Sequence, residues 1–142
     1  MKNNKIMVFV IEDNELQQEF YKGQFKKEYY FIQAFNTEDT RKILDELYLG
    51  KYEYKKDGET LFLVSIKDVD FIGLDGCLNS RELNTLDFAK EMRANVNSNC
   101  KIIATSSDKT YNNELCAGND RCHDYCEKEM FGFHIKSNKW AA

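Results

Sequence analysis

The chain has 142 residues, 42% of them hydrophobic, and its 24 acidic and 20 basic residues give it a net charge of −4. This length fits one ordinary domain with a real core and leaves no room for a second module of similar size. The negative charge and the lack of a basic block or an arginine-rich face argue against a surface that tracks a phosphate backbone, so we expect no direct nucleic-acid binding.

No apolar run is as long as a membrane span, and residues 1–5 lead straight into a strand-like segment without a signal-peptide core. We therefore expect a soluble, cytoplasmic protein with no membrane association. The five cysteines are an odd number without a secretory signal, which favours free thiols in a reducing compartment over a disulfide framework.

The first 50 residues alternate between strand-like and helix-like segments. A continuous apolar run over residues 5–11 predicts a strand covered on both faces, and residues 30–35 predict a second strand. Helical periodicity predicts an amphipathic helix over about residues 15–27 and another from an N-cap at residues 36–37 to Gly50. The predicted apolar face of the first helix consists of Leu16, Phe20 and Phe25. Such alternation is typical of a parallel sheet with crossover helices.

Residues 51–66 interrupt this alternation. Apolar and polar residues alternate up to the turn signal Asp57-Gly58, and a strand-prone run follows, so we predict an inserted β-hairpin. A surface loop is the alternative. If the hairpin forms, we expect it to be a partner-specific surface.

The remaining segments continue the alternation of strands and helices. Apolar runs predict the central strand, over residues 70–74, and a fourth strand over residues 101–105. A fifth strand is predicted over residues 121–126. The helices are predicted at residues 83–94 and 111–117, with a brief amphipathic helix within residues 130–140.

Polar side chains with related chemistry follow four of these strands. Glu12 and Asp13 follow the first strand, Asp75 the third, Ser106 the fourth and Lys128 the fifth. In a doubly wound parallel sheet these ends converge on one edge, where ligands bind. Carboxylates suit Mg²⁺, and a hydroxyl and an ammonium suit a phosphoryl group. Taken alone, Asp75 also fits a simple turn-capping role.

The segments 10–14, 70–75, 102–107 and 124–128 together resemble the receiver domain of response regulators, over about residues 5–130. The resemblance implies a flavodoxin-like α/β fold, a doubly wound five-stranded parallel sheet of order 2-1-3-4-5 with helices on both faces. It implies that residues 1–142 are a single receiver domain without an output domain. The signal would then pass to a downstream protein target, and homodimer formation stays open.

The resemblance also implies a role for each site residue. Asp75 would be the phosphoacceptor in a two-component phosphorelay, taking a phosphoryl group from a histidine kinase or a histidine phosphotransfer protein. Transfer and autodephosphorylation would be self-catalysed, unlike the reaction of a conventional enzyme. Asp13 and Asp75 would bind Mg²⁺ directly, Glu12 would bind it through water, and the backbone carbonyl of Cys77 would complete the protein ligands. The phosphoryl partners would be Ser106 and Lys128, and the switch residues would be Ser106 and Tyr125.

The sequence departs from the family pattern at several positions. Glu129 stands where a proline usually follows the lysine, which puts a cis peptide bond there in doubt. Asn79 also replaces a common proline, in a loop about two residues longer than usual. The other departures are an insertion at Cys122-His123, Ser107 beside the phosphoryl site, Asp108 close to it, and Gly132 in a short last helix.

Three alternatives stay open from the sequence. A zinc module would use Cys116, Cys122, His123 and Cys126, although their spacing matches no common zinc motif. A phosphatase of the haloacid dehalogenase type would use Asp75 as nucleophile, but such enzymes carry an aspartate where this chain has Cys77. A degenerate receiver fold would act as a binding module independent of phosphorylation.

Overall fold

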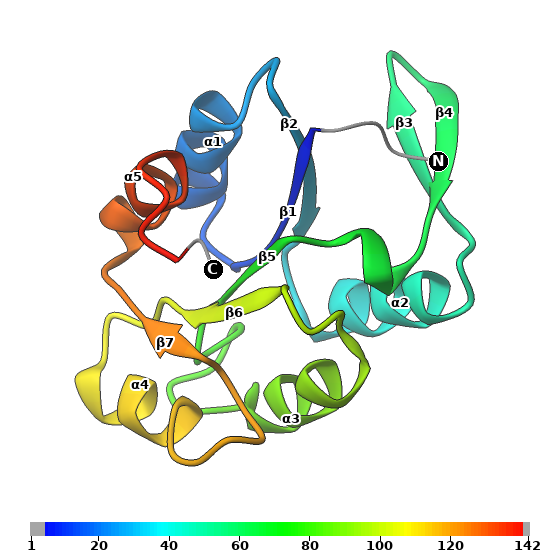
Figure 1. Ribbon diagram of the computed structural model, residues 1–142. Helices are drawn as coiled ribbons and strands as arrows, with labels where there is room; N and C mark the ends of the chain where they lie inside the picture. Colours follow the sequence, from blue (N-terminus) through cyan, green and yellow to red (C-terminus); the bar gives the residue numbers. More distant parts are fainter. Residues whose placement is uncertain (1–4, 141–142) are drawn as a thin grey trace.

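The computed structural model describes residues 5–140, whose strands form a five-stranded sheet of order β2-β1-β5-β6-β7 and a separate β3-β4 hairpin (Figure 1). All pairings within the five-stranded sheet are parallel. Its strands are β1 (Ile6–Ile11), β2 (Tyr29–Ala34), β5 (Phe71–Leu74), β6 (Lys101–Ala104) and β7 (Asp124–Tyr125). The hairpin strands count as third and fourth in the chain, so this order confirms the predicted 2-1-3-4-5 sheet. Residues 1–4, part of the segment without a signal-peptide pattern, lie outside the described residues.

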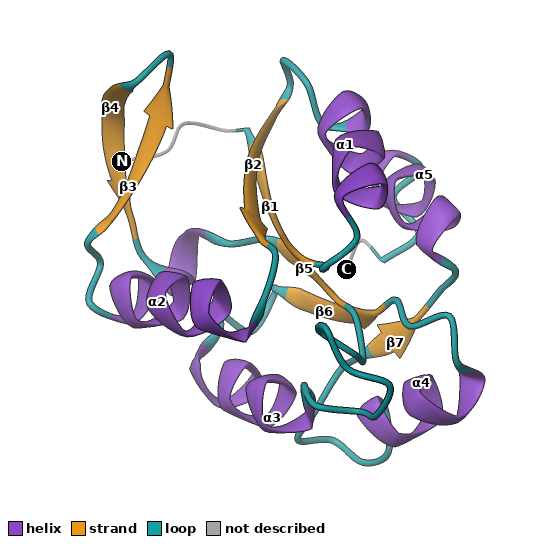
Figure 2. Ribbon diagram, turned by 180° about the vertical axis from the view of Figure 1, so that it is seen from behind, coloured by secondary structure: helices purple, strands orange, loops and turns teal. Residues whose placement is uncertain are grey.

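Helices cover both faces of the sheet. They are α1 (Glu15–Gln24), α2 (Thr37–Tyr48), α3 (Leu86–Asn95), α4 (Lys109–Leu115) and α5 (Phe131–Lys136), with short 3-10 helices η1 (Ile66–Asp68) and η2 (Lys128–Met130). Figure 2 shows α1 and α5 on one face, and α2 and α3 on the other. Side chains at Asn14, Asn36 and Asp108 cap the starts of α1, α2 and α4. Between residues 5 and 140, no helix has the length and apolar character that crossing a bilayer requires.

Strand β1 lies at the centre of the core. Its residues alternate between two hydrophobic clusters, with Phe9 and Ile11 in one and Val8 and Val10 in the other. All four side chains are at most 1% exposed. Burial on both faces explains why the sequence of this strand is a continuous apolar run and does not alternate.

The predicted buried face of α1 is wrong in part. Phe25, just after the helix, is buried, but Leu16 is 83% exposed and Phe20 is 47% exposed. The buried face is formed by Gln18 and Tyr21. The Gln18 amide donates to the carbonyl oxygens of Glu12 and Ala34. These bonds require the polar side chain to face the sheet, which turns Leu16 outward.

The predicted hairpin is confirmed. Strands β3 (Tyr52–Lys56) and β4 (Glu59–Val64) pair in antiparallel fashion around Asp57-Gly58. Both turn residues have positive φ, 54° and 81°, as a tight two-residue hairpin turn requires. Aromatic side chains of the hairpin hold it against β2, with the Tyr54 and Phe62 ring centroids 5.0 Å and 4.9 Å from that of Tyr30.

The last predicted strand is shorter than expected. Its ladder pairing with β6 covers only Asp124 and Tyr125, not residues 121–126. The backbone amide of Cys122 donates to Leu115 of α4, so this part of the segment follows the helix and not the sheet. The predicted terminal helix is present as η2 followed by α5.

Candidate functional site

Three carboxylates meet at the carboxyl ends of the two central strands. Glu12 and Asp13 follow β1, and Asp75 follows β5, as the sequence predicts. Each side chain offers an oxygen atom, and these atoms lie within 4.8 Å of one another. Over residues 5–140, they are the only group of three or more acidic, histidine or cysteine side chains close enough to share a metal ion.

Backbone amides hold two of these carboxylates in place. Asn14 N donates to Glu12 Oε2 at 3.1 Å, and Asn79 N donates to Asp13 Oδ2 at 2.7 Å. Asn79 adopts a left-handed backbone conformation with φ of 53°. An asparagine accepts this conformation more readily than most residues, which gives a structural reason for its place in the loop after Asp75.

Lys128 brings one positive charge to the three carboxylates. Its Nζ atom lies 2.9 Å from Glu12 Oε1 and 3.3 Å from Asp75 Oδ2. The contact with Glu12 is a close ion pair, so the buried Oε1 atom has Lys128 as its partner. Tyr21, which is fully buried, donates its hydroxyl to the backbone carbonyl of Lys128 at 3.0 Å and so fixes the start of η2.

Burial makes Glu12 and Asp75 weaker acids than usual. The pKa of Glu12 is raised to about 7, first by burial and then by the neighbouring charge of Asp75. Burial also raises the pKa of Asp75, although Lys128 opposes this shift. The pKa of Lys128 is raised as well, because its contacts with Glu12 and Asp75 outweigh its burial. Three carboxylates with one ammonium leave excess negative charge in a buried place.

This donor set fits a hard divalent cation. Carboxylate oxygens are the preferred ligands of Mg²⁺, and a Mg²⁺ site in proteins usually combines one or two carboxylates with water. The excess of carboxylates over ammonium groups also favours a cation here. The contribution of the Cys77 carbonyl stays a prediction.

Ser106 is held at the end of β6 by a residue that the sequence analysis missed. The Asn112 side chain accepts a hydrogen bond from Ser106 N at 2.9 Å and donates one to Ser106 O at 2.8 Å. Both residues are 5% exposed. Ser106 Oγ accepts a bond from Asp108 N at 3.2 Å. The available signal for Asn112 was a polar residue three positions before the buried Leu115, on the inner face of the predicted helix.

Thr85 is a second residue that the sequence analysis missed. Its hydroxyl is fully buried and donates to the carbonyls of Asp75, at 2.8 Å, and Gly76, at 3.2 Å. The Asn84 amide accepts from Leu78 N and donates to Leu78 O. These bonds fix the loop that leaves Asp75, and no local pattern in the sequence indicates them.

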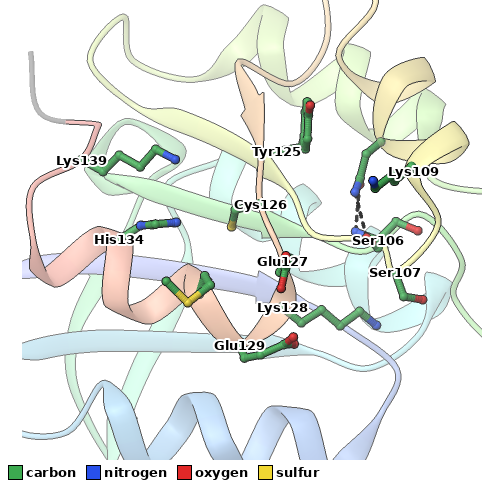
Figure 3. Close-up of a pocket in the computed structure, with 12 residues that line it drawn as sticks. Ser106, Ser107, Lys109, Tyr125, Cys126, Glu127, Lys128, Glu129, His134 and Lys139 are labelled. Carbon is green, nitrogen blue, oxygen red and sulfur yellow. Dashed lines mark hydrogen bonds between the residues drawn. The ribbon is translucent and has the colours of Figure 1, made fainter.

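A hollow of about 540 Å³ adjoins the site between β7, η2 and the start of α4. Its lining includes Ser106 and Lys128 of the site, and also Tyr125 and His134. Figure 3 shows Lys128 extending toward the loop that carries Ser106, whereas Tyr125 points away from it. The Tyr125 side chain is 49% exposed.

The proposed zinc cluster is not present in the described part of the chain. Cys122 packs in the cluster on one face of the sheet and Cys126 in the cluster on the other. His123 Nδ1 accepts a hydrogen bond from Ile102 N, so this nitrogen is already occupied. No group of metal-capable side chains in residues 5–140 includes these residues.

No family model and no curated protein matches the sequence. Solved structures match it well in three dimensions. Response regulator TrrA from Thermotoga maritima, in complex with Mg²⁺ and BeF, has a TM-score of 0.61 at 17% identity, over 95% of this chain and 98% of that chain. The phosphorylated cyanobacterial phytochrome response regulator RcpA has a TM-score of 0.61 at 11% identity, over 95% and 91%.

A plant protein shows the same likeness. The receiver domain of the histidine kinase CKI1 from Arabidopsis thaliana has a TM-score of 0.55 at 18% identity, over 94% of this chain and 89% of that chain. The sheet order, the flanking helices and these similarities agree. The chain therefore has the fold of a response regulator receiver domain.

Proposed function

We propose that this chain is a phosphoacceptor that takes a phosphoryl group on Asp75 from a phosphohistidine of a histidine kinase or histidine phosphotransfer protein. The observation that carries the proposal is the placement of Asp75 at the end of the central strand, 3.3 Å from Lys128 and grouped with Glu12 and Asp13. The receiver fold supports the proposal, because in open α/β sheets ligands bind at this edge.

In the proposed step, a carboxylate oxygen of Asp75 attacks phosphorus and forms a new O–P bond. The P–N bond of the phosphohistidine breaks, and the imidazole nitrogen keeps the electron pair. The protein positions the reactants and stabilises the charge on the phosphoryl oxygens, so no dedicated base is required. Lys128, already beside Asp75, would pair with a phosphoryl oxygen.

Asp13 and Asp75 would hold Mg²⁺ directly, with Glu12 acting through water and the Cys77 carbonyl as a further ligand. When bound, the cation would neutralise part of the charge on the carboxylates and on the phosphoryl oxygens. The grouping of the three carboxylates and the excess negative charge of the site support this assignment.

Phosphorylation would change the surface near Ser106 and Tyr125. A phosphoryl group adds about two negative charges and strong acceptor oxygens, to which the Ser106 hydroxyl can donate. Movement of Ser106 toward the phosphoryl group would open space beside the 540 Å³ hollow for the half-exposed ring of Tyr125. The altered face would then bind a downstream protein target.

Nuclear magnetic resonance with beryllofluoride, a phosphoryl analogue, tests this proposal. With Mg²⁺ present, we expect the amide signals of Ser106 and Tyr125 to shift in the wild type and in Asp87→Asn, an exposed control on α3. Asp75→Asn should show no such shifts. If the wild type does not respond, the chain instead acts as a binding module independent of phosphorylation.

A further inference from the structure

A second groove lies at the opposite end of the sheet from the three carboxylates. It has a volume of about 440 Å³ and runs between the end of α1, strand β2 and the hairpin β3-β4. Figure 1 shows α1 and the hairpin on either side of β2. The groove includes Lys5, next to the start of β1, and Tyr29 at the start of β2, whereas Glu12 and Asp75 follow the ends of their strands.

The charge of this groove is opposite to that of the whole chain. Although the chain carries a net charge of −4, six lysines line the groove, and no acidic residue is among the described residues of its lining. These lysines come from three separate segments: Lys5, Lys22, Lys26, Lys27, Lys55 and Lys56. Positive charge is therefore concentrated in one place on an acidic protein.

The charges of five of these lysines are not compensated within the described structure. Lys22, Lys26 and Lys27, near the end of α1, form no ion pair with any of residues 5–140, and neither do Lys55 and Lys56. Lysines at the end of a helix interact favourably with its dipole, which accounts for those near α1. The dipole of α1 does not account for Lys55 and Lys56, which belong to the hairpin on the other side of the groove.

The groove contains an edge strand of the sheet, whose middle amide is already bonded to the hairpin. Strand β2 is the last strand of the sheet and pairs only with β1. On its open side, the amide of Phe31 donates to the hydroxyl of Tyr54 at 3.1 Å, so a side chain and not a strand satisfies it. Because alternate residues of a strand point their amides in the same direction, Tyr29 and Gln33 also direct theirs outward. Leu61, which is 52% exposed, adds an apolar contact at the rim.

We propose that this groove binds an acidic, extended segment of a partner protein, with its carboxylates against the lysines and its backbone along β2. Charge complementarity favours an acidic partner, and an exposed strand edge favours an extended peptide. The proposal does not depend on phosphorylation of Asp75, since the two sites lie at opposite ends of the sheet.

A single-stranded nucleic acid fits this groove less well. Binding of that kind uses free aromatic faces for stacking and often arginine. Here the rings pack on one another, with Phe25 5.2 Å from Tyr29 and 5.5 Å from Phe31, and Tyr54 5.4 Å from Phe62. No arginine is among the described residues that line the groove.

Fluorescence anisotropy with a labelled peptide of about six residues, a common strand length, in which Glu alternates with Val, tests the proposal. We expect binding that weakens as salt is added, because exposed charges are screened. The double variant Lys26→Glu/Lys55→Glu should weaken binding about tenfold or more, since each substitution replaces attraction by repulsion. The control Lys42→Glu/Lys90→Glu makes the same change in net charge at exposed lysines of α2 and α3 and should bind as the wild type does.

Amide shifts locate the peptide on the full chain. Shifts centred on Tyr29, Gln33 and Tyr54 would support the proposal, whereas shifts around Asp75 would overturn it. Equal weakening in both double variants would overturn it as well, because the effect would then come from net charge alone. No detectable binding of the peptide, or tighter binding of a labelled oligothymidylate of similar charge, would also overturn it.

Discussion

The Nζ atom of Lys128 lies 3.3 Å from Oδ2 of Asp75, across a separation of 53 residues in the sequence. The same nitrogen lies 2.9 Å from Glu12 Oε1. One ammonium thus faces two buried carboxylates, and its loss would leave both without a cation in the described structure. A buried charge without a partner is costly, which makes this residue a test of the electrostatics of the site.

Replacing Lys128 by methionine should lower the free energy of unfolding by about 1–3 kcal/mol at pH 8. At pH 5 the loss should be smaller, because Glu12, with a pKa of about 7, is then largely protonated. Urea unfolding at both pH values measures this difference. Lys109→Met, an exposed lysine of the same hollow, is the control and should change stability little. An equal loss at both pH values would contradict the electrostatic explanation.

The raised pKa of Glu12 predicts a pH dependence of stability. Because the pKa of this carboxyl group is about 7 in the folded chain, against 4.5 for an ordinary glutamate in water, the folded chain holds the proton more tightly than the unfolded chain does. This contribution to stability is present below pH 4.5 and is lost as the pH rises through 7.

Glu12→Gln cannot ionise, so at pH 8 it should be more stable than the wild type by roughly 3 kcal/mol, with little difference at pH 4.5. Urea unfolding across this pH range checks the prediction. The exposed Glu19→Gln on α1 removes the same charge and should follow the wild-type curve. A variant Glu12→Gln that loses stability at pH 8 would show that the ionised carboxylate stabilises the fold.

Addition of Mg²⁺ should raise the melting temperature, because a ligand that binds only the folded state stabilises it. The rise should be larger at pH 8 than at pH 6, since protons compete with the cation for the carboxylates. Differential scanning calorimetry of Asp13→Asn should show most of this rise lost, and Asp87→Asn should retain it. The metal assignment fails if both variants respond to Mg²⁺ equally.

Asn112→Ala should destabilise the fold by about 2–4 kcal/mol, because it leaves the buried backbone N–H and C=O of Ser106 without their partners. Asn113→Ala, at an exposed position of the same helix, should cost much less. Chemical denaturation measures both. Similar losses would mean that the asparagine bridge to Ser106 adds little and that helix propensity explains the effect.

Much of the fold could be predicted from the sequence, because each central strand is a continuous apolar run that ends at a polar residue. In a parallel sheet such ends lie together, so Glu12, Asp13 and Asp75 could be placed at one edge from the sequence alone. The hairpin could be predicted from Asp57-Gly58, a dipeptide that suits the positive φ values of a tight turn.

Other features depend on contacts between distant segments. Gln18 and Asn112 are polar residue types that are usually exposed, yet both are buried because they satisfy backbone groups at strand ends. Leu16 is apolar and lies at helical spacing from Phe20, so the sequence pattern assigns it to the core. In the structure this side chain is exposed. The lysine groove could not be predicted either, because its residues come from three segments and form no block in the sequence.

The most direct test of the phosphoacceptor assignment is incorporation of ³²P from labelled acetyl phosphate or a phosphorylated histidine phosphotransfer protein, with Mg²⁺ or with EDTA. We predict base-labile label on the wild type and on Asp87→Asn when Mg²⁺ is present, and none on Asp75→Asn or in EDTA. Label that persists in a folded Asp75→Asn variant, or a folded wild type that takes no label from either donor, would contradict the assignment of Asp75 as the phosphoacceptor.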